Sequence, residues 1–191
     1  MKRLFLILIV FILGTHPCAA ESPKSSEKWF EKGKQYFSEK NYQEAIDAFT
    51  RTIRLNPKHA KAYNNRGAAY HNLGHYERAL MDYDRAIALN PENAKFYHNR
   101  GAAYYNLYHF EEAIKNFDKS IDLKPDDAEV YVDRGVAYDR ISNHEMALAN
   151  MKRAARLGNQ QARVYLSRHG IVVPPNGGMH SRGIPYFTKK K

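Results

Sequence analysis

The sequence predicts an all-α fold, a solenoid of four helix–turn–helix units followed by a short capping helix. Three features predict it: glycines recur every 34 residues, aromatic and small residues keep fixed offsets from each glycine, and prolines close three of the units. Regular periods of roughly 20–50 residues are typical of solenoids, in which each unit buries the apolar face of its neighbour.

The repeated columns define the units. The glycines are Gly33, Gly67, Gly101 and Gly135, with a tyrosine three residues later at Tyr36, Tyr70, Tyr104 and Tyr138. An aromatic residue lies four positions before each glycine, at Trp29, Tyr63, Tyr97 and Tyr131. Later columns are Ala45, Ala79, Ala113 and Ala147, then Phe49, Tyr83, Phe117 and Met151, then Pro57, Pro91 and Pro125. These columns frame units at 26–59, 60–93, 94–127 and 128–161.

Each unit is expected to contain two antiparallel helices, for example 60–73 and 76–89. Proline cannot continue a helix, so Pro91 ends the second one, and Asn93 and Asp127 are suitable N-caps for the units that follow. Glycine inside a helix costs about 1 kcal/mol relative to alanine. We therefore expect Gly67 to lie where two helices approach closely and a neighbouring ring fills the gap.

The two ends of the chain differ from the repeats. Residues 1–20 combine Lys2 and Arg3, an apolar run from 4 to 13, and small residues, as secretory signal peptides do. Residues 21–25 are then a linker. After the fourth unit an amphipathic helix over about 160–169, with domain bounds 162–170, is expected to cap the solenoid. Residues 171–191 are rich in Pro, Gly and Lys and are expected to form a flexible basic tail.

The signal peptide predicts export to the periplasm or the outside of the cell. Cys18 is the only cysteine, so a chain cleaved after Ala20 has no disulfide. Lipoprotein anchoring through Cys18 is the less favoured alternative, because "THP" before it does not fit the Leu-small-small pattern of lipoprotein signals.

The columns resemble those of tetratricopeptide repeat proteins, and the resemblance covers most of residues 26–161. Only the last unit departs from the pattern, with Asn159 in place of the proline and Met151 in place of the aromatic residue. The resemblance implies a right-handed superhelix whose first helices line a concave groove. It also implies a protein-protein interaction module, a scaffold that holds a peptide or helix of a partner, without a cofactor and without enzymatic activity.

The resemblance places one set of side chains in that groove. The predicted partner-binding residues are Phe30, Lys34, Phe37, Lys61, Asn64, Asn65, Ala68, His71, Lys95, His98, Asn99, Ala102, Tyr105, Val132 and Asp139. Lysines, amides and rings dominate the first three units, whereas the fourth is acidic, which favours an acidic ligand near units one to three. Chaperone-binding members hold a carboxylate with two lysines, two asparagines and an arginine. Here those positions are Phe30, Lys34, Asn65, Lys95 and Asn99, so only two match and we expect no such clamp.

Other functions find little support in the sequence. The net charge of +10 resides largely in the tail, because residues 26–161 hold 21 Lys/Arg against 19 Asp/Glu; nucleic-acid binding would need the excess on one folded face. The Arg66–Gly67 pair lacks the glycine-rich context of a phosphate loop, and Arg66 and its counterparts are expected to pair with carboxylates such as Asp84 or Asp118. The histidines do not form a metal motif, and no catalytic motif is evident. The alternative function is a weak contact of the basic tail with anionic lipid or cell-wall polymer.

Overall fold

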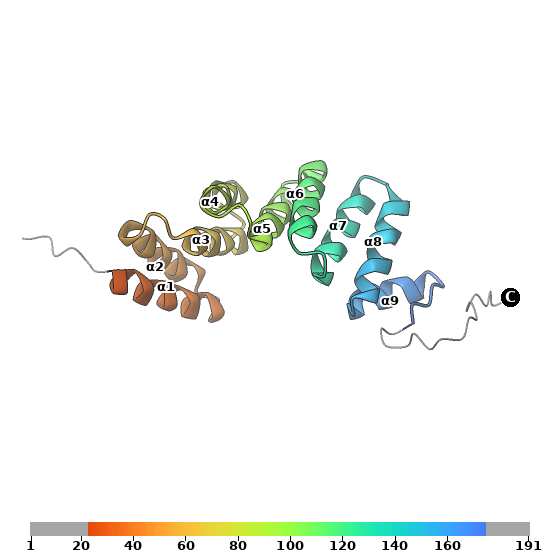
Figure 1. Cartoon of the computed structure of the whole chain (residues 1–191), viewed down its shortest axis with the longest axis horizontal. Helices are drawn as coiled ribbons and strands as arrows, with labels where there is room; N and C mark the ends of the chain where they lie inside the picture. Colours follow the sequence, from red (N-terminus) through yellow and green to blue (C-terminus); the bar gives the residue numbers. More distant parts are fainter. Residues whose placement is uncertain (1–22, 175–191) are drawn as a thin grey trace, which may run out of the picture.

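The computed structural model describes residues 23–174, and these residues form nine α-helices and no strand (Figure 1). The predicted signal peptide and most of the predicted tail lie outside the described residues. The helices are α1 (Pro23–Ser38), α2 (Tyr42–Leu55), α3 (Ala60–Asn72), α4 (Tyr76–Leu89), α5 (Ala94–Asn106), α6 (Phe110–Leu123), α7 (Ala128–Arg140), α8 (His144–Arg156) and α9 (Gln160–Arg168).

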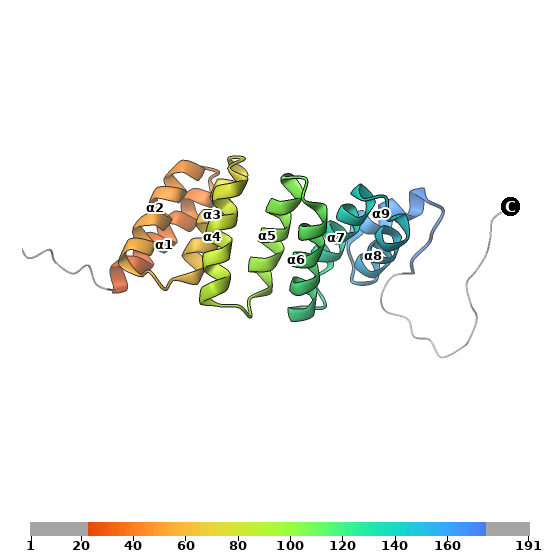
Figure 2. The same ribbon diagram turned by 90° about the horizontal axis from the view of Figure 1, so that it is seen from above.

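The helices form consecutive antiparallel pairs. Each odd-numbered helix from α1 to α7 packs against the even-numbered helix that follows it, and α9 packs against α8. The pairs stack along the chain into an arch whose odd-numbered helices lie towards its lower, inner side in Figure 1, and Figure 2 shows the same stack from above. The predicted all-α solenoid of paired helices with a capping helix is therefore confirmed.

Two predicted boundaries differ from the structure. α1 begins at Pro23, inside the predicted linker 21–25, because proline suits the first turn of a helix, where its missing N–H is not needed. α9 (Gln160–Arg168) agrees with the helix predicted over about 160–169, whereas the domain bounds given for it, 162–170, begin and end two residues later. The Asn159 side chain accepts a hydrogen bond from the Ala162 N–H at 2.9 Å and so fixes the earlier start.

The repeated glycines lie where paired helices approach closely. A Cβ atom added at Gly101 would lie 2.6 Å from Cε1 of Phe117, and one added at Gly67 would lie 2.8 Å from Cε1 of Tyr83. Both rings are 1% exposed. The interpretation of the glycine column as a close helix contact filled by a ring is confirmed, and burial of that ring offsets the cost of glycine within the helix.

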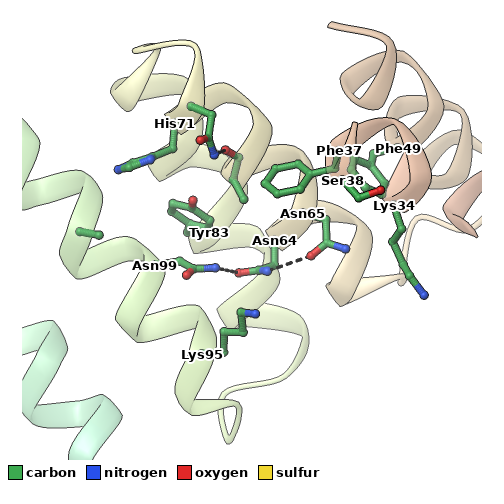
Figure 3. A pocket seen from close by; sticks show the side chains of 13 residues that line it. Lys34, Phe37, Ser38, Phe49, Asn64, Asn65, His71, Tyr83, Lys95 and Asn99 are labelled. Atoms are coloured by element: carbon green, nitrogen blue, oxygen red, sulfur yellow. Dashed lines mark hydrogen bonds between the residues drawn. The ribbon is translucent and has the colours of Figure 1, made fainter. Parts of the chain in front are cut away.

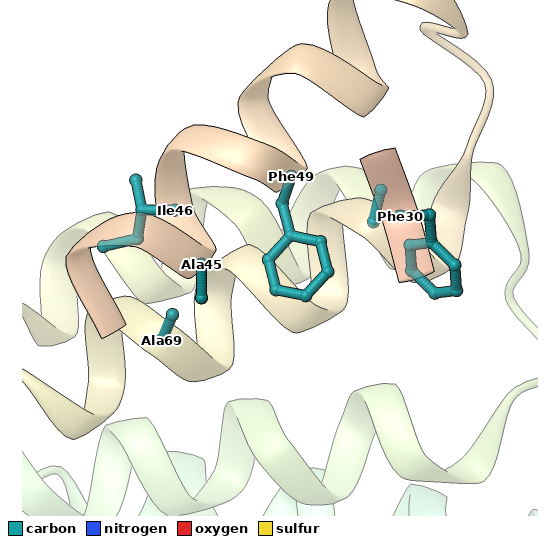
Figure 4. Packing of buried hydrophobic residues seen from close by; sticks show 6 residues of the cluster. Phe30, Ala45, Ile46, Phe49 and Ala69 are labelled. Carbon is teal, nitrogen blue, oxygen red and sulfur yellow. The ribbon is translucent and has the colours of Figure 1, made fainter. Parts of the chain in front are cut away.

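The core continues from unit to unit along the stack. In the first unit, Phe30, Ala45, Ile46 and Phe49 pack with Ala69 of α3, so the cluster joins unit one to unit two (Figure 4). Equivalent clusters surround Tyr83, Phe117 and Met151. Neighbouring units thus share their apolar faces, as a solenoid requires.

Arg66, Arg100 and Arg134 precede the repeated glycines of units two to four, and each of them joins helices of two units. Arg100 donates through Nε to Asn116 of its own unit at 2.7 Å and through Nη1 to Asp84 of the preceding unit at 2.6 Å. Arg134 bonds Asn150 and Asp118 in the same way. Arg66 instead forms a two-pronged pair with Asp82 of its own unit and reaches only the hydroxyl of Thr50 in unit one. These arginines are structural, as the sequence predicted, with Asp82 as an additional partner.

Candidate functional site

A cavity of about 480 Å³ opens between α1, α3 and α5, the first helices of units one to three (Figure 3). Rings from α2 and α4 close part of its wall. Its lining consists of Lys34, Phe37, Ser38, Phe49, Asn64, Asn65, Ala68, His71, Asn72, Tyr83, Lys95, Asn99 and Ala102.

Nine of the fifteen predicted groove residues line this cavity. They are Lys34, Phe37, Asn64, Asn65, Ala68, His71, Lys95, Asn99 and Ala102. Sequence reasoning missed Ser38, Phe49, Asn72 and Tyr83. Phe49 and Tyr83 belong to second helices and are buried, so they lie behind the cavity wall. The column of rings opposite the glycines was the signal that could have found them.

Six predicted residues lie elsewhere. Phe30 is 6% exposed and packs on the rings of Phe49 and His59, at 5.8 and 4.5 Å between centroids, because its apolar side chain is more stable in the core than in the groove. Lys61 is exposed near the start of α3. The remaining four, His98, Tyr105, Val132 and Asp139, lie towards units three and four, outside the cavity.

The cavity has an apolar wall and a basic rim. Phe37, Ala68 and Ala102 are half-buried and supply apolar surface, and the buried rings of Phe49 (0% exposed) and Tyr83 (1% exposed) lie behind it. Burial raises the pKa of the Tyr83 hydroxyl. Lys34 on α1 and Lys95 on α5 are exposed and stand on opposite sides of the opening (Figure 3). An apolar surface between two cations can hold an apolar side chain flanked by carboxylates.

A chain of amides crosses the cavity from α5 to α3. Asn99 donates to Oδ1 of Asn64 at 2.8 Å, and Asn64 donates to Oδ1 of Asn65 at 3.2 Å. Asn64 is only 3% exposed, so its role is to hold its two neighbours in position. The amide nitrogen of Asn65 points away from Asn64 (Figure 3).

His71 forms another part of the wall. Asn106 donates to its Nε2 at 2.9 Å, and Tyr76 packs edge-on at 5.2 Å between ring centroids. Burial lowers the pKa of His71 below its ordinary value of 6.5. The ring is therefore neutral at neutral pH, which suits its role as an acceptor for the Asn106 amide.

This lowered pKa predicts that acid destabilises the fold. Between the folded pKa of His71 and 6.5 the unfolded chain binds more protons than the folded chain, so the free energy of unfolding falls as the pH drops below about 6.5. His71→Gln keeps an acceptor for Asn106 and does not titrate. Urea unfolding from pH 8 to 5 is expected to show a flatter pH dependence for His71→Gln than for the wild type; equal slopes would contradict this role.

The groove sides of successive first helices are joined by hydrogen bonds between residues 35 positions apart. Asn64–Asn99 and His71–Asn106 join α3 to α5. Between α5 and α7, His98 pairs with Asp133 at 2.6 Å and Arg140 donates to the Tyr105 hydroxyl at 2.8 Å. We call these four contacts the groove ladder. His98 and Tyr105, which were predicted to bind a partner, therefore form contacts between units three and four.

Across 23–174, no three His, Cys, Asp or Glu side chains converge in a way that could hold a metal ion. In the same stretch, none of the helices combines the length and the apolarity needed to cross a membrane.

Comparison with known proteins agrees with this architecture. Tetratricopeptide repeat models match residues 34–98 and 94–127. The first TPR of Spaghetti (RPAP3), solved with the HSP90 peptide SRMEEVD, is 30% identical; the match covers 65% of this chain and 98% of that one, with a TM-score of 0.62. The chain belongs to the tetratricopeptide repeat (TPR) family. The TPR is a scaffold fold for protein-protein interaction and is typically non-enzymatic.

Other solved structures are similar over comparable lengths. The first TPR domain of human RPAP3 is 31% identical, with 65% of this chain and 98% of that chain covered and a TM-score of 0.62. MamA is 27% identical, with 74% and 82% covered and a TM-score of 0.67. No curated protein sequence gives a significant match.

Proposed function

We propose that the chain is an exported interaction module that binds an acidic peptide segment of a partner protein in the cavity between α1, α3 and α5. The observation that carries this proposal is the apolar wall of Phe37, Ala68 and Ala102, backed by the buried rings of Phe49 and Tyr83, between Lys34 and Lys95. A peptide segment with one apolar side chain and neighbouring carboxylates fits both the apolar wall and the two lysines. The amide of Asn65 can donate a hydrogen bond to the peptide backbone.

The peptide complex of the related RPAP3 domain supports this type of ligand. Its peptide, SRMEEVD, carries apolar and acidic residues together. Three of the five positions of the chaperone-binding clamp nevertheless differ here, at Phe30, Lys34 and Asn99, and Phe30 is buried outside the cavity. We therefore expect recognition to depend on Lys34 and Lys95, without a dedicated clamp for a terminal carboxylate.

Direct peptide binding tests the proposal. Fluorescein-labelled SRMEEVD, its neutral counterpart SRMQQVN and a basic counterpart SRMKKVK are titrated with the protein and followed by fluorescence polarisation. The acidic peptide is expected to bind about tenfold more tightly than the neutral one, with the basic peptide weakest. Equal binding of all three, or binding of none, would refute an acidic ligand at this site.

The proposed export rests on residues 1–20, which lie outside the described residues. The protein is expected in the periplasm or the medium, with its N-terminus at Glu21, because cleavage after Ala20 removes the apolar run. N-terminal sequencing of the protein from each cell fraction checks this prediction. An intact Met1 in the cytoplasm would contradict export, and a blocked N-terminus at Cys18 would instead indicate lipoprotein anchoring. The alternative function, envelope contact through the basic tail, involves residues that are almost all outside the described range.

A further inference from the structure

The junction between units one and two lacks the directional contacts that join the later units. The groove ladder has two bonds between α3 and α5 and two between α5 and α7. The equivalent pairs of positions between α1 and α3 are Phe30 with Asn65 and Phe37 with Asn72, and a phenylalanine ring has no atom that can accept or donate a conventional hydrogen bond. Within the described residues, the ladder therefore begins only at unit two.

The arginine contacts weaken at the same junction. Units two and three are joined by the ion pair Arg100–Asp84, and units three and four by Arg134–Asp118. The corresponding position in unit one is Thr50, so Arg66 makes only a neutral contact across this junction, at 3.0 Å. Its charged partner, Asp82, is in its own unit. The groove ladder and the arginine contacts lie on different sides of the first helices. Both are weaker at the junction between units one and two than at the later junctions.

Besides the Arg66–Thr50 bond and a 3.6 Å contact between Glu27 of α1 and His59, the N-cap of α3, the contacts between units one and two are mainly apolar. Phe30, Ile46 and Phe49 pack against Ala62 and Ala69 of α3. Apolar contact is favourable but non-directional, so it holds two bodies together without fixing their angle as hydrogen bonds do. Small sliding movements of packed helices are a common form of domain closure.

The cavity crosses this junction. Lys34, Phe37, Ser38 and Phe49 belong to unit one, whereas the other nine lining residues belong to units two and three. We propose that unit one, α1 and α2, is a jaw that rotates against a rigid block of α3 to α8, and that this rotation opens and closes the cavity. The proposal concerns the ligand-free protein and does not depend on the nature of the ligand.

Register-matched spin labels test the jaw in one chain. Asp47, Met81, Lys115 and Ala149 occupy the same exposed column of α2, α4, α6 and α8. Residues 21–191 retain every described helix and contain no cysteine. Distances are measured by double electron–electron resonance in Asp47→Cys/Lys115→Cys and in Met81→Cys/Ala149→Cys. The first pair spans the weak junction, and its distance distribution is expected to be at least about twice as wide as that of the second pair.

Transplanting the arginine contacts tests whether the junction is the cause. Thr50→Asp with Asp82→Asn gives Arg66 the partners that Arg100 and Arg134 have, and is expected to narrow the 47/115 distribution towards the width of 81/149. The reciprocal change, Asp118→Thr with Asn150→Asp, gives the junction of units three and four the pattern of the first and is expected to widen 81/149 alone. The jaw is refuted if 47/115 is no wider than 81/149, or if neither exchange alters the widths.

A bound peptide gives a separate readout. Because the cavity wall is divided between the jaw and the block, an acidic peptide that binds there is expected to narrow the 47/115 distribution. This step alone rests on the proposed function. If the peptide does not bind, the proposed ligand is wrong, while the widths of the ligand-free protein still decide the jaw; if it binds without narrowing, the jaw does not close on it and that part of the inference is wrong.

Discussion

Replacing Phe117 by alanine is expected to lower the free energy of unfolding by about 3–5 kcal/mol, the range for a large aromatic side chain removed from a core. The Phe117 ring is 1% exposed and fills the space that Gly101 leaves on α5. It also packs edge-on against His98, at 5.8 Å between ring centroids. Gly101 cannot move into the space that the removed ring leaves, because it lies within a regular helix. Urea unfolding followed by circular dichroism measures the loss.

Phe110 provides the matched control for Phe117. It lies at the start of the same helix, is only partly buried, and contacts Tyr105 at 5.4 Å between ring centroids. Phe110→Ala removes the same atoms but leaves a site that water can reach, so its cost is expected to be less than half as large. Equal losses for the two variants would mean that burial against Gly101 is not what makes Phe117 important.

The fold could be predicted from the sequence because its main determinants are local and repeated. The 34-residue spacing of Gly67 and Gly101 predicted the helix pairs, and the helix predicted at 76–89 is found at Tyr76–Leu89. The N-caps were also predictable: the side chains of Asn93 and Asp127 accept hydrogen bonds from backbone N–H groups of Lys95 and Glu129. Because the same pattern recurs in four units, an ambiguous stretch in one unit does not change the prediction of its helices.

The site was less predictable because it depends on how units differ from one another. Phe30 occupies a groove position by register, yet its apolar ring packs into the core. Asn64 also occupies a groove position, but its side chain is used to hold Asn65 and Asn99. Contacts between residues 35 positions apart require the curvature of the stack, which the 34-residue period alone does not specify. The 34-residue period therefore predicts the helix pairs, whereas the residues that differ between units determine the cavity.

Reversing the charge of both rim lysines is expected to weaken binding of the acidic peptide by at least about 100-fold, because two charge-assisted contacts are replaced by repulsion. Lys34 and Lys95 lie on opposite sides of the cavity, on α1 and α5. Fluorescence polarisation with labelled SRMEEVD compares the wild type with Lys34→Glu/Lys95→Glu. Both side chains are exposed, so the double variant is expected to retain the fold.

The same change in net charge can be made away from the cavity. Lys115→Glu/Lys119→Glu alters two exposed residues of α6 that do not line it. This variant is expected to lose little affinity at 0.15 M salt, where charges more than about 8 Å apart are largely screened. Similar losses in both double variants would show that the peptide responds only to net charge, and the assignment of the two lysines would then be wrong.

A change of ligand preference separates specific recognition from simple loss of binding. If Lys34 and Lys95 select the ligand by charge, the Lys34→Glu/Lys95→Glu variant is expected to bind SRMKKVK more tightly than SRMEEVD. The apolar wall of Phe37, Ala68 and Ala102 is unchanged in the variant, so it contributes equally to both peptides. Reversal of the order therefore assigns selectivity to the rim and affinity for the apolar residue to the wall. If the variant binds neither peptide and keeps its helical signal, the lysines do more than supply charge, and their aliphatic stems must contribute to the cavity itself.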